Sequence, residues 1–452
     1  MLIDVSIVII FLIANLIIGL LASKNINNFS HFSVGHRSFN SFIIFATLTA
    51  SFIGGGYSLG NAAKVYSDGM MYAFALLGFS LKEILVAQFI APRMDAHNDC
   101  FSIGDIIFKR YGLNAKIITG IFSVIICTGI LGAQVGAMAS IIDTFFKINV
   151  LWGIIVSFGI IIIYSSLGGM RAVVFADIFQ FAILIIGIPL TFFIGLHYIG
   201  GLHSLIQKTP SGYINFFHSP GDVLLFISLF ITFMFGETLV PPYVQRLFMA
   251  KTSKQTQRGT LYSGLISIPF FIIAGAIGLI ALIMNPHIIP NQAMPYVIKE
   301  TLPIGVRGFV IAGLLAIIMS SAAGFLNAAS VAFVNDIIKP LKKDASERLL
   351  LVSAKGINFF VGVGAVFFAL AINNILDILL YAYNFWSPII LVPLLAVIFN
   401  IDAKPKNFFY GASGGIITML IWSQLLGSPF HISPVVIGIL GNLALFIWSR
   451  KY

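Results

Sequence analysis

The stretch TASFIGGGYSLG, residues 49–60, lies inside a mostly apolar segment that covers residues 39–63. A membrane-spanning helix needs about 20 such residues, but each of three consecutive glycines weakens a helix by about 1 kcal/mol relative to alanine. Unwound backbone is tolerated at membrane depth only where protein buries it or where it lines a cavity. The segment therefore predicts a broken spanning helix whose freed carbonyls can bind a cation. The alternative is that the glycines only allow close helix packing.

A second break is predicted at GETLVPPY, residues 236–243, in the apolar segment 221–245. Pro241 and Pro242 each remove a backbone donor and clash with the preceding helical turn. The two broken segments are the second and the seventh along the chain, five spans apart, as two inverted five-helix repeats would place them. The alternative is an ordinary proline kink.

Composition identifies the class of protein around these breaks. Only 9% of the 452 residues are charged, whereas soluble domains carry about 25%, and the mean hydropathy is +1.01. These values exclude a water-soluble enzyme and a nucleic-acid-binding module. Two cysteines exclude a disulfide scaffold and a Cys-rich metal site. No nucleophile–base constellation and no phosphate-binding loop occurs, so we expect neither an enzyme nor an ATP-driven transporter.

Thirteen apolar segments are long enough to span a membrane, and together they predict one all-α transmembrane domain. They cover residues 3–22, 39–63, 71–92, 115–145, 150–167, 173–198, 221–245, 259–285, 306–335, 351–373, 375–399, 407–426 and 431–449.

The basic residues predict the orientation of these segments. With the N-terminus outside, 20 of the 26 Lys and Arg residues, Arg246 among them, fall in cytoplasmic loops. Lys and Arg mark the cytoplasmic side of membrane proteins. We therefore expect the N-terminus outside, the C-terminus in the cytoplasm, and a multi-pass protein of the plasma (inner) membrane. The net charge of +10 is then a sign of topology rather than of an acidic partner.

Two hydroxyl side chains, Ser320 and Ser321, stand in the apolar ninth segment within IMSSAAG, residues 318–324. They offer the oxygen ligands that hard cations such as Na⁺ prefer. The alternative is that they hydrogen-bond to carbonyls of their own helix.

Charges inside predicted spans are costly and are functional candidates by default, and three of them stand out. Lys82 and Glu83 are adjacent in the third span. Sequence neighbours on a helix do not face each other, so we expect these two not to pair directly. Glu237 lies in the seventh-span break, where its carboxylate would face a central cavity and favour a cationic or zwitterionic amine.

Several motifs in a fixed order resemble the solute:sodium symporter family. They are the glycine run at 54–56, GGMRAV at 168–173 with ADIFQ at 176–180, Gln245-Arg246, the Ser320-Ser321 pair and NDI at 335–337. The resemblance covers nearly the whole chain and implies a LeuT-type fold. The implied parts are an extra N-terminal helix (3–22), a first repeat (39–198), an inverted second repeat (221–399) and two further helices (407–449).

The resemblance also implies ion sites. The main Na⁺ site would use carbonyls of Ala50, Ile53 and Ile317 and the hydroxyls of Ser320 and Ser321. Some family members have a second cation site with an acid matching Asp177 and hydroxyls just after the serine pair. Ala323 and Gly324 stand at those later positions here.

The glycine run is also similar to the choline-transporter branch, which encloses its substrate in aromatic rings. Phe52 matches one ring position, whereas Val240 and Ile126 stand at others, so a solute other than choline is expected. The candidate substrate-binding residues are Phe52, Gly55, Gly56, Tyr57, Glu83, Glu237, Thr238, Val240 and Tyr383.

The resemblance implies sodium-coupled import of a small organic solute by alternating access. A cationic or zwitterionic amine, or an amino acid, is the expected solute, and the partners are Na⁺ and the lipid bilayer, with no nucleic acid. The alternatives are a non-transporting membrane sensor and a sodium-independent uniporter or channel.

Overall fold

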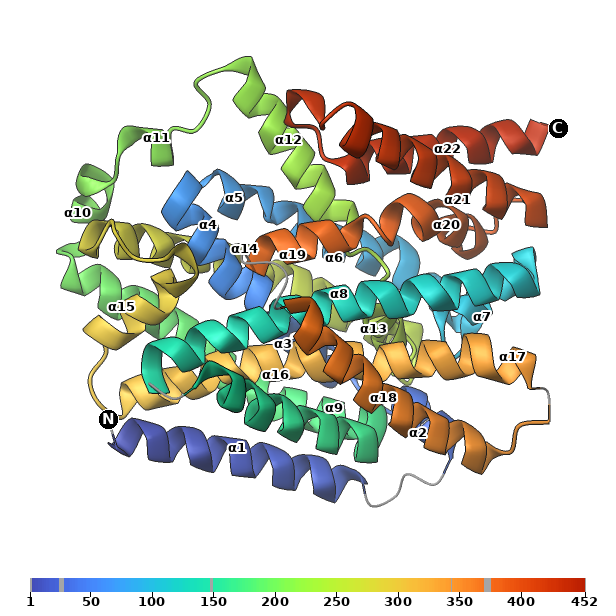
Figure 1. Cartoon of the computed structure of the whole chain (residues 1–452), viewed down its shortest axis with the longest axis horizontal. Coiled ribbons are helices and arrows are strands. Elements are labelled where there is room, and N and C mark those ends of the chain that lie inside the picture. The colour runs from blue at the N-terminus through green and yellow to red at the C-terminus, as the bar shows by residue number, and fades with distance from the viewer. Residues whose placement is uncertain (1, 24–27, 147–148, 343, 370–374, 452) are drawn as a thin grey trace.

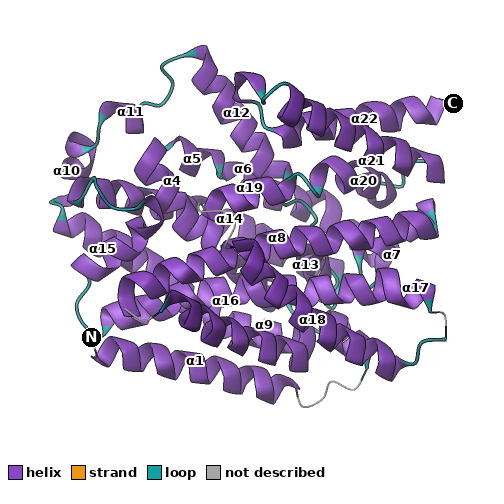
Figure 2. Cartoon of the chain, in the orientation of Figure 1, coloured by secondary structure: helices purple, strands orange, loops and turns teal. Residues whose placement is uncertain are grey.

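The computed structural model describes residues 2–451 apart from 24–27, 147–148, 343 and 370–374. Over these ranges the chain consists of helices joined by short loops, with no strand, as Figure 2 shows. One isolated bridge pairs Phe39 with Ala250. The predicted all-α fold is confirmed.

Nine helices of the described chain are long and apolar enough to cross a membrane, or ten if one bent pair counts as a span. All thirteen predicted segments fall on helices, although residues 370–373 of the tenth lie outside the described ranges. The count of thirteen spans stays a prediction, because some of these helices are joined and others are broken. The long or span-forming helices are α1 (Leu2–Ser23), α5 (Met71–Ala75), α6 (Leu77–Leu85), α8 (Leu113–Phe146), α9 (Val150–Tyr198), α14 (Ser253–Met284), α16 (Val306–Phe333), α18 (Glu347–Ala369), α19 (Ile375–Tyr383), α20 (Val392–Ile398), α21 (Pro405–Leu420) and α22 (Pro434–Lys451). The shorter connecting helices are α2 (Phe29–Val34), α7 (Ile103–Tyr111), α10 (Gly201–Lys208), α11 (Ser211–Ile214), α15 (Ala293–Thr301) and α17 (Lys339–Leu341).

Helix α9 joins the two predicted segments 150–167 and 173–198 without an intervening loop. Its backbone is non-helical at Gly169, where φ is 50° and ψ is −149°. A side chain at this position would also place a Cβ 2.5 Å from the carbonyl oxygen of Phe32. Glycine is therefore required both by the left-handed backbone and by the contact with α2.

Both predicted helix breaks occur. The second segment forms α3 (Ser41–Phe52), then a π-helical turn η2 (Gly56–Gly60) and α4 (Asn61–Asp68), bent by 58° at the break. The seventh forms α12 (Pro220–Phe235) and α13 (Pro241–Leu247). Pro241 is the first residue of α13, where a missing backbone N–H leaves no hydrogen bond unmade. The proline pair thus starts a second half-helix rather than bending one helix.

Helix α16 lies at the centre of the bundle. Of its most apolar 18-residue window, 94% of the residues are buried, against 22% for α1 and 28% for α22. Figure 1 shows α1 along one edge of the molecule and α21 with α22 along the opposite edge. Both α3 and α13 contact α16, so each broken segment reaches the central helix.

Candidate functional site

The glycine run lets the broken second segment lie directly against its neighbours. A Cβ on Gly54 would come 2.5 Å from Ser321 Oγ, and one on Gly56 would come 2.0 Å from Leu379 Cδ1. The backbone N–H of Gly55 donates to Gln134 Oε1 of α8 at 3.0 Å. The break therefore brings backbone, rather than side chains, to α16, α8 and α19.

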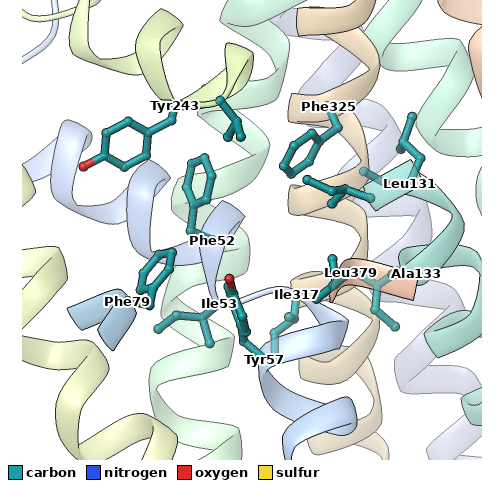
Figure 3. Close-up of a cluster of buried hydrophobic side chains, with 14 of the residues drawn as sticks. Phe52, Ile53, Tyr57, Phe79, Leu131, Ala133, Tyr243, Ile317, Phe325 and Leu379 are labelled. Carbon is teal, nitrogen blue, oxygen red and sulfur yellow. The ribbon is translucent and has the colours of Figure 1, made fainter. Parts of the chain in front are cut away.

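The five candidate Na⁺ ligands lie on two helices that pack against each other, the end of α3 and the middle of α16. Ala50 and Ile53 lie in the last turn and at the C-cap of α3, and Ile317, Ser320 and Ser321 lie on α16. All five are at most 1% exposed. Figure 3 shows Ile53 beside the break and Ile317 on the facing helix.

Both hydroxyls of the serine pair bond across this contact rather than to their own helix. Ser321 Oγ donates to the carbonyl of Ser51 at 2.6 Å, and Ser320 Oγ donates to Asp177 Oδ1 at 2.5 Å. Ser320 Oγ also lies 3.0 Å from Ser51 Oγ. Back-bonding within α16 does not explain these serines, and the hydroxyl, carbonyl and carboxylate oxygens that they contact are ligand types that hard cations prefer.

Asp177 of α9, the candidate second cation ligand, is paired with an arginine. The guanidinium of Arg246 lies 3.1 Å from Asp177 Oδ2, and both side chains are fully buried. The expectation that Arg246 lies in a cytoplasmic loop is wrong, because this residue is in the last turn of the half-helix α13 and is fully buried. The sequence does contain a signal for the surroundings of Asp177 that we did not use. Thr47 and Ser51 are spaced i, i+4, which puts two hydroxyls on one face of α3.

Four of the nine candidate substrate-binding residues line a small cavity beside the two breaks, whereas Gly55, Glu83, Thr238, Val240 and Tyr383 are not part of its lining. Its lining includes Phe52, Gly56 and Tyr57 from the second segment, Glu237 from the seventh and Ser321 from α16. The cavity volume is about 10 Å³, enough for no more than one water molecule. A cavity of this size is too small for an organic solute, which could bind here only after the surrounding groups move.

The aromatic residues Phe52, Tyr57 and Phe325 line part of the cavity, and further rings pack behind them. Figure 3 shows Phe52, Phe79 and Tyr243 grouped beside the break, with Phe325 facing them from α16. The ring centroids of Phe52 and Phe325 are 6.1 Å apart. Phe79, which the sequence analysis did not select, contacts the rings of both Phe52 and Tyr57.

Glu237 is held by two tyrosines. The hydroxyl of Tyr383 donates to Glu237 Oε2 at 3.3 Å, and the hydroxyl oxygens of Tyr57 and Tyr383 are 2.5 Å apart. Thr238 and Val240 are buried in the same break, but the hydroxyl of Thr238 donates to the carbonyl of Met234. Thr238 and Val240 are therefore part of the broken segment without lining the cavity, whereas Glu237 lines it.

The expectation that Lys82 and Glu83 do not pair is wrong. Lys82 Nζ lies 2.6 Å from Glu83 Oε1, and Tyr243 donates to Glu83 Oε2 at 3.1 Å. The side chains of adjacent helical residues leave the backbone in different directions, but the four-carbon lysine side chain is long enough to fold over its neighbour. Its ammonium lies 3.8 Å from the ring centre of Phe79 and 4.4 Å from that of Tyr243. Both charges are thereby satisfied internally.

One buried carboxylate differs from the others in its charge balance. The described chain has five buried acids, and four of them lie within 4.0 Å of a basic nitrogen. These four are Asp4 with Arg307, Glu83 with Lys82, Asp177 with Arg246 and Asp336 with Lys116. Glu237 forms no ion pair with any described residue. If it is ionised, it leaves one negative charge beside the cavity for a ligand to balance.

Two broken helices that meet a central helix at a closed cavity are features of membrane transporters. Residues 32–415 match the sodium:solute symporter family, and this chain belongs to that family. It is therefore an integral membrane protein of a transporter family rather than an enzyme, as predicted.

Curated relatives resemble the chain at low identity. Sodium-coupled monocarboxylate transporter 2 of Bos taurus is 26% identical over 74% of this chain and 57% of its own length. Sodium/proline symporter 2 of Staphylococcus saprophyticus is 25% identical over 94% of this chain and 88% of its own length. The chain thus spans less than two thirds of the first of these relatives but most of the second.

A solved structure of a Na⁺-coupled sialic acid symporter, substrate-bound and outward-open, matches the whole chain with a TM-score of 0.82 at 20% identity. The match covers 98% of that protein. Together with other neighbours of the same architecture, it confirms the predicted LeuT-type fold.

Proposed function

We propose that this chain is a sodium-coupled symporter that imports a small amine-bearing solute, most simply an amino acid, by alternating access. Family membership supports the coupling to Na⁺. The observation that supports the choice of solute is Glu237, a buried carboxylate beside the cavity that forms no ion pair within 4.0 Å with any described residue.

The proposed Na⁺ site joins the two halves of the bundle. Ala50 and Ile53 belong to the proposed first repeat (39–198), whereas Ile317, Ser320 and Ser321 belong to the proposed second (221–399). An ion bound by both sets favours the arrangement in which α3 and α16 are in contact. Na⁺ promotes solute binding to the extent that it binds more tightly to the state with an open cavity than to the closed one, with α3 and α16 in contact in both.

Charge balance supports an amine, and a zwitterion in particular. The pairs Lys82–Glu83 and Asp177–Arg246 are each neutral, so ionised Glu237 leaves the centre with one negative charge. One Na⁺ balances that charge overall, and a zwitterionic solute adds none. The ammonium group of the solute would lie against Glu237, and nearby aromatic rings such as Phe52 and Tyr57 would contact it by cation–π attraction.

The curated relatives divide on solute, but one of them agrees with this reading. The names of the relatives at similar identity include monocarboxylate, glucose, iodide and proline carriers. The proline symporter aligns over the largest shared length of these four. A proline-like or other small amino acid is therefore the first solute to test.

The proposed direction of transport follows the charge bias of the loops. With the N-terminus outside and the C-terminus in the cytoplasm of a plasma membrane, Na⁺ and solute enter from outside and leave inward as the repeats rock.

Uptake in proteoliposomes tests the proposal. Purified chain is first screened by thermal shift against amino acids, amines, carboxylates and sugars, with and without Na⁺, because a bound ligand raises apparent stability. Uptake of the best solute is then measured with an inward Na⁺ gradient and with K⁺ replacing Na⁺. Symport predicts Na⁺-dependent uptake that is accompanied by an inward current. Equal uptake in K⁺ would refute it in favour of a uniporter, and solute binding without uptake would favour a sensor.

A further inference from the structure

We propose that Arg246 is a resident cation that permanently fills an oxygen-lined cation site around Asp177, so that the chain binds one Na⁺ rather than two. The inference rests on the Na⁺ coupling proposed above. It concerns the number of ions bound, which the family membership and the fold do not decide.

The surroundings of the Arg246 guanidinium have the composition of a cation site. Nη2 donates to Asp177 Oδ2 at 3.1 Å and to Ser51 Oγ at 2.5 Å, and Nε donates to Thr47 Oγ1 at 3.0 Å. Nη1 donates to the carbonyl of Pro242 at 3.1 Å. A carboxylate, two hydroxyls and a carbonyl are the ligand types that hard cations prefer, and here they surround a guanidinium.

The same oxygens are organised around Asp177 as well as around the arginine. Thr47 and Ser51 donate to Asp177 Oδ2, and Ser320 donates to Oδ1. The carboxylate therefore accepts from three hydroxyls contributed by α3 and α16. With the guanidinium removed, the carboxylate and these hydroxyls would offer oxygen ligands to a metal cation.

Space for the guanidinium comes from a second, independent feature of the chain. A Cβ on Gly324 would lie 2.8 Å from Nη2 and 2.9 Å from Nη1 of Arg246. Gly324 is one of the two positions after the serine pair where some family members carry a hydroxyl. In this chain, the hydroxyl ligand is absent and the space is occupied by the arginine.

The arginine is a cation that cannot leave the site. Its guanidinium stays protonated at all relevant pH values, and its side chain is 0% exposed on α13. A second Na⁺ at Asp177 would have to share one carboxylate with this fixed charge. Ser320, which donates to Asp177, is also a proposed ligand of the main Na⁺ site, so the fixed charge lies next to that site and helps to orient its ligand.

The experiment counts Na⁺ ions in the purified full-length chain. ²²Na⁺ binding at saturation gives the number of ions per chain, and the Hill coefficient of a Na⁺-induced thermal shift gives a second measure. The wild type should bind one Na⁺ with a Hill coefficient of 1. Arg246→Gln should bind two with a coefficient above 1. Arg246→Lys and the charge-balanced double variant Asp177→Asn/Arg246→Gln should each bind one.

The outcomes separate this inference from the proposed function. Two Na⁺ in the wild type, or one Na⁺ in folded Arg246→Gln, overturns the resident-cation inference but leaves symport intact. No Na⁺ in the wild type overturns the proposed coupling instead. If Arg246→Gln does not fold, the wild type and the double variant decide. One Na⁺ bound to the wild type and one to the double variant supports the inference. Two Na⁺ in the wild type and one in the double variant would make Asp177 a Na⁺ ligand and overturn it.

Discussion

Replacing Glu237 with glutamine tests the proposed solute class most directly. Glutamine keeps the shape of the side chain and still accepts the hydrogen bond from Tyr383, so only the charge is lost. Two unit charges 4 Å apart attract by about 4 kcal/mol at an effective dielectric constant of about 20. Each 1.4 kcal/mol is a factor of about ten in affinity, so the half-saturation concentration of an amine solute should rise by about 10³-fold.

The assay is concentration-dependent uptake in proteoliposomes at saturating Na⁺, using the solute found in the thermal-shift screen. Glu237→Asp, which keeps the charge, should lose far less affinity than Glu237→Gln. Glu300→Gln removes an exposed carboxylate on α15 and serves as the matched control, with uptake expected within twofold of wild type. A half-saturation concentration within threefold of wild type in Glu237→Gln would refute the assignment, and tighter binding would indicate an anionic solute.

Three further perturbations follow from the geometry. Ser320→Ala with Ser321→Ala should raise the Na⁺ concentration for half-maximal uptake at least tenfold, and unchanged Na⁺ dependence removes both from the site. Gly278→Ala puts a Cβ 2.2 Å from the backbone carbonyl oxygen of Ala62, so overpacking should destabilise the protein by about 1–3 kcal/mol, measured by thermal unfolding. Gly356→Ala is the control, because its Cβ meets no atom within 4 Å and should not destabilise the protein. Lys82→Met alone leaves Glu83 buried and unpaired, at a cost of about 3–5 kcal/mol, and the double variant with Glu83→Gln should recover most of that loss. Equal melting temperatures for the single and double variants would contradict the pair.

The two breaks were predictable because glycine and proline act through the local backbone. Gly54 and Pro241 stand at the ends of half-helices for reasons that hold in any surroundings. The serine pair was predictable for a related reason, since two adjacent hydroxyls in a long apolar run are conspicuous. Features of this kind need only the sequence and the membrane as context.

The partners of the charged residues were not predictable in the same way. In the sequence, Arg246 directly follows the apolar segment 221–245, a position shared by many arginines at the cytoplasmic ends of spans. Only the way in which α13 ends inside the bundle buries it beside Asp177. The pairing of Lys82 with Glu83 likewise depends on the rings of Phe79 and Tyr243, which lie on different helices and close over the ammonium.

The closed cavity has a consequence for how affinities of this protein should be interpreted. A space of about 10 Å³ admits no amino acid, so under the proposed assignment of the solute site to this cavity the protein must open before it binds solute. Every measured dissociation constant then equals the intrinsic constant divided by the fraction of molecules that are open. Two solutes tested on the wild type share that fraction, and their ratio reports their contacts alone. Two variants tested with one solute do not share it, and a gain in affinity can come from a weakened closed state without any new contact.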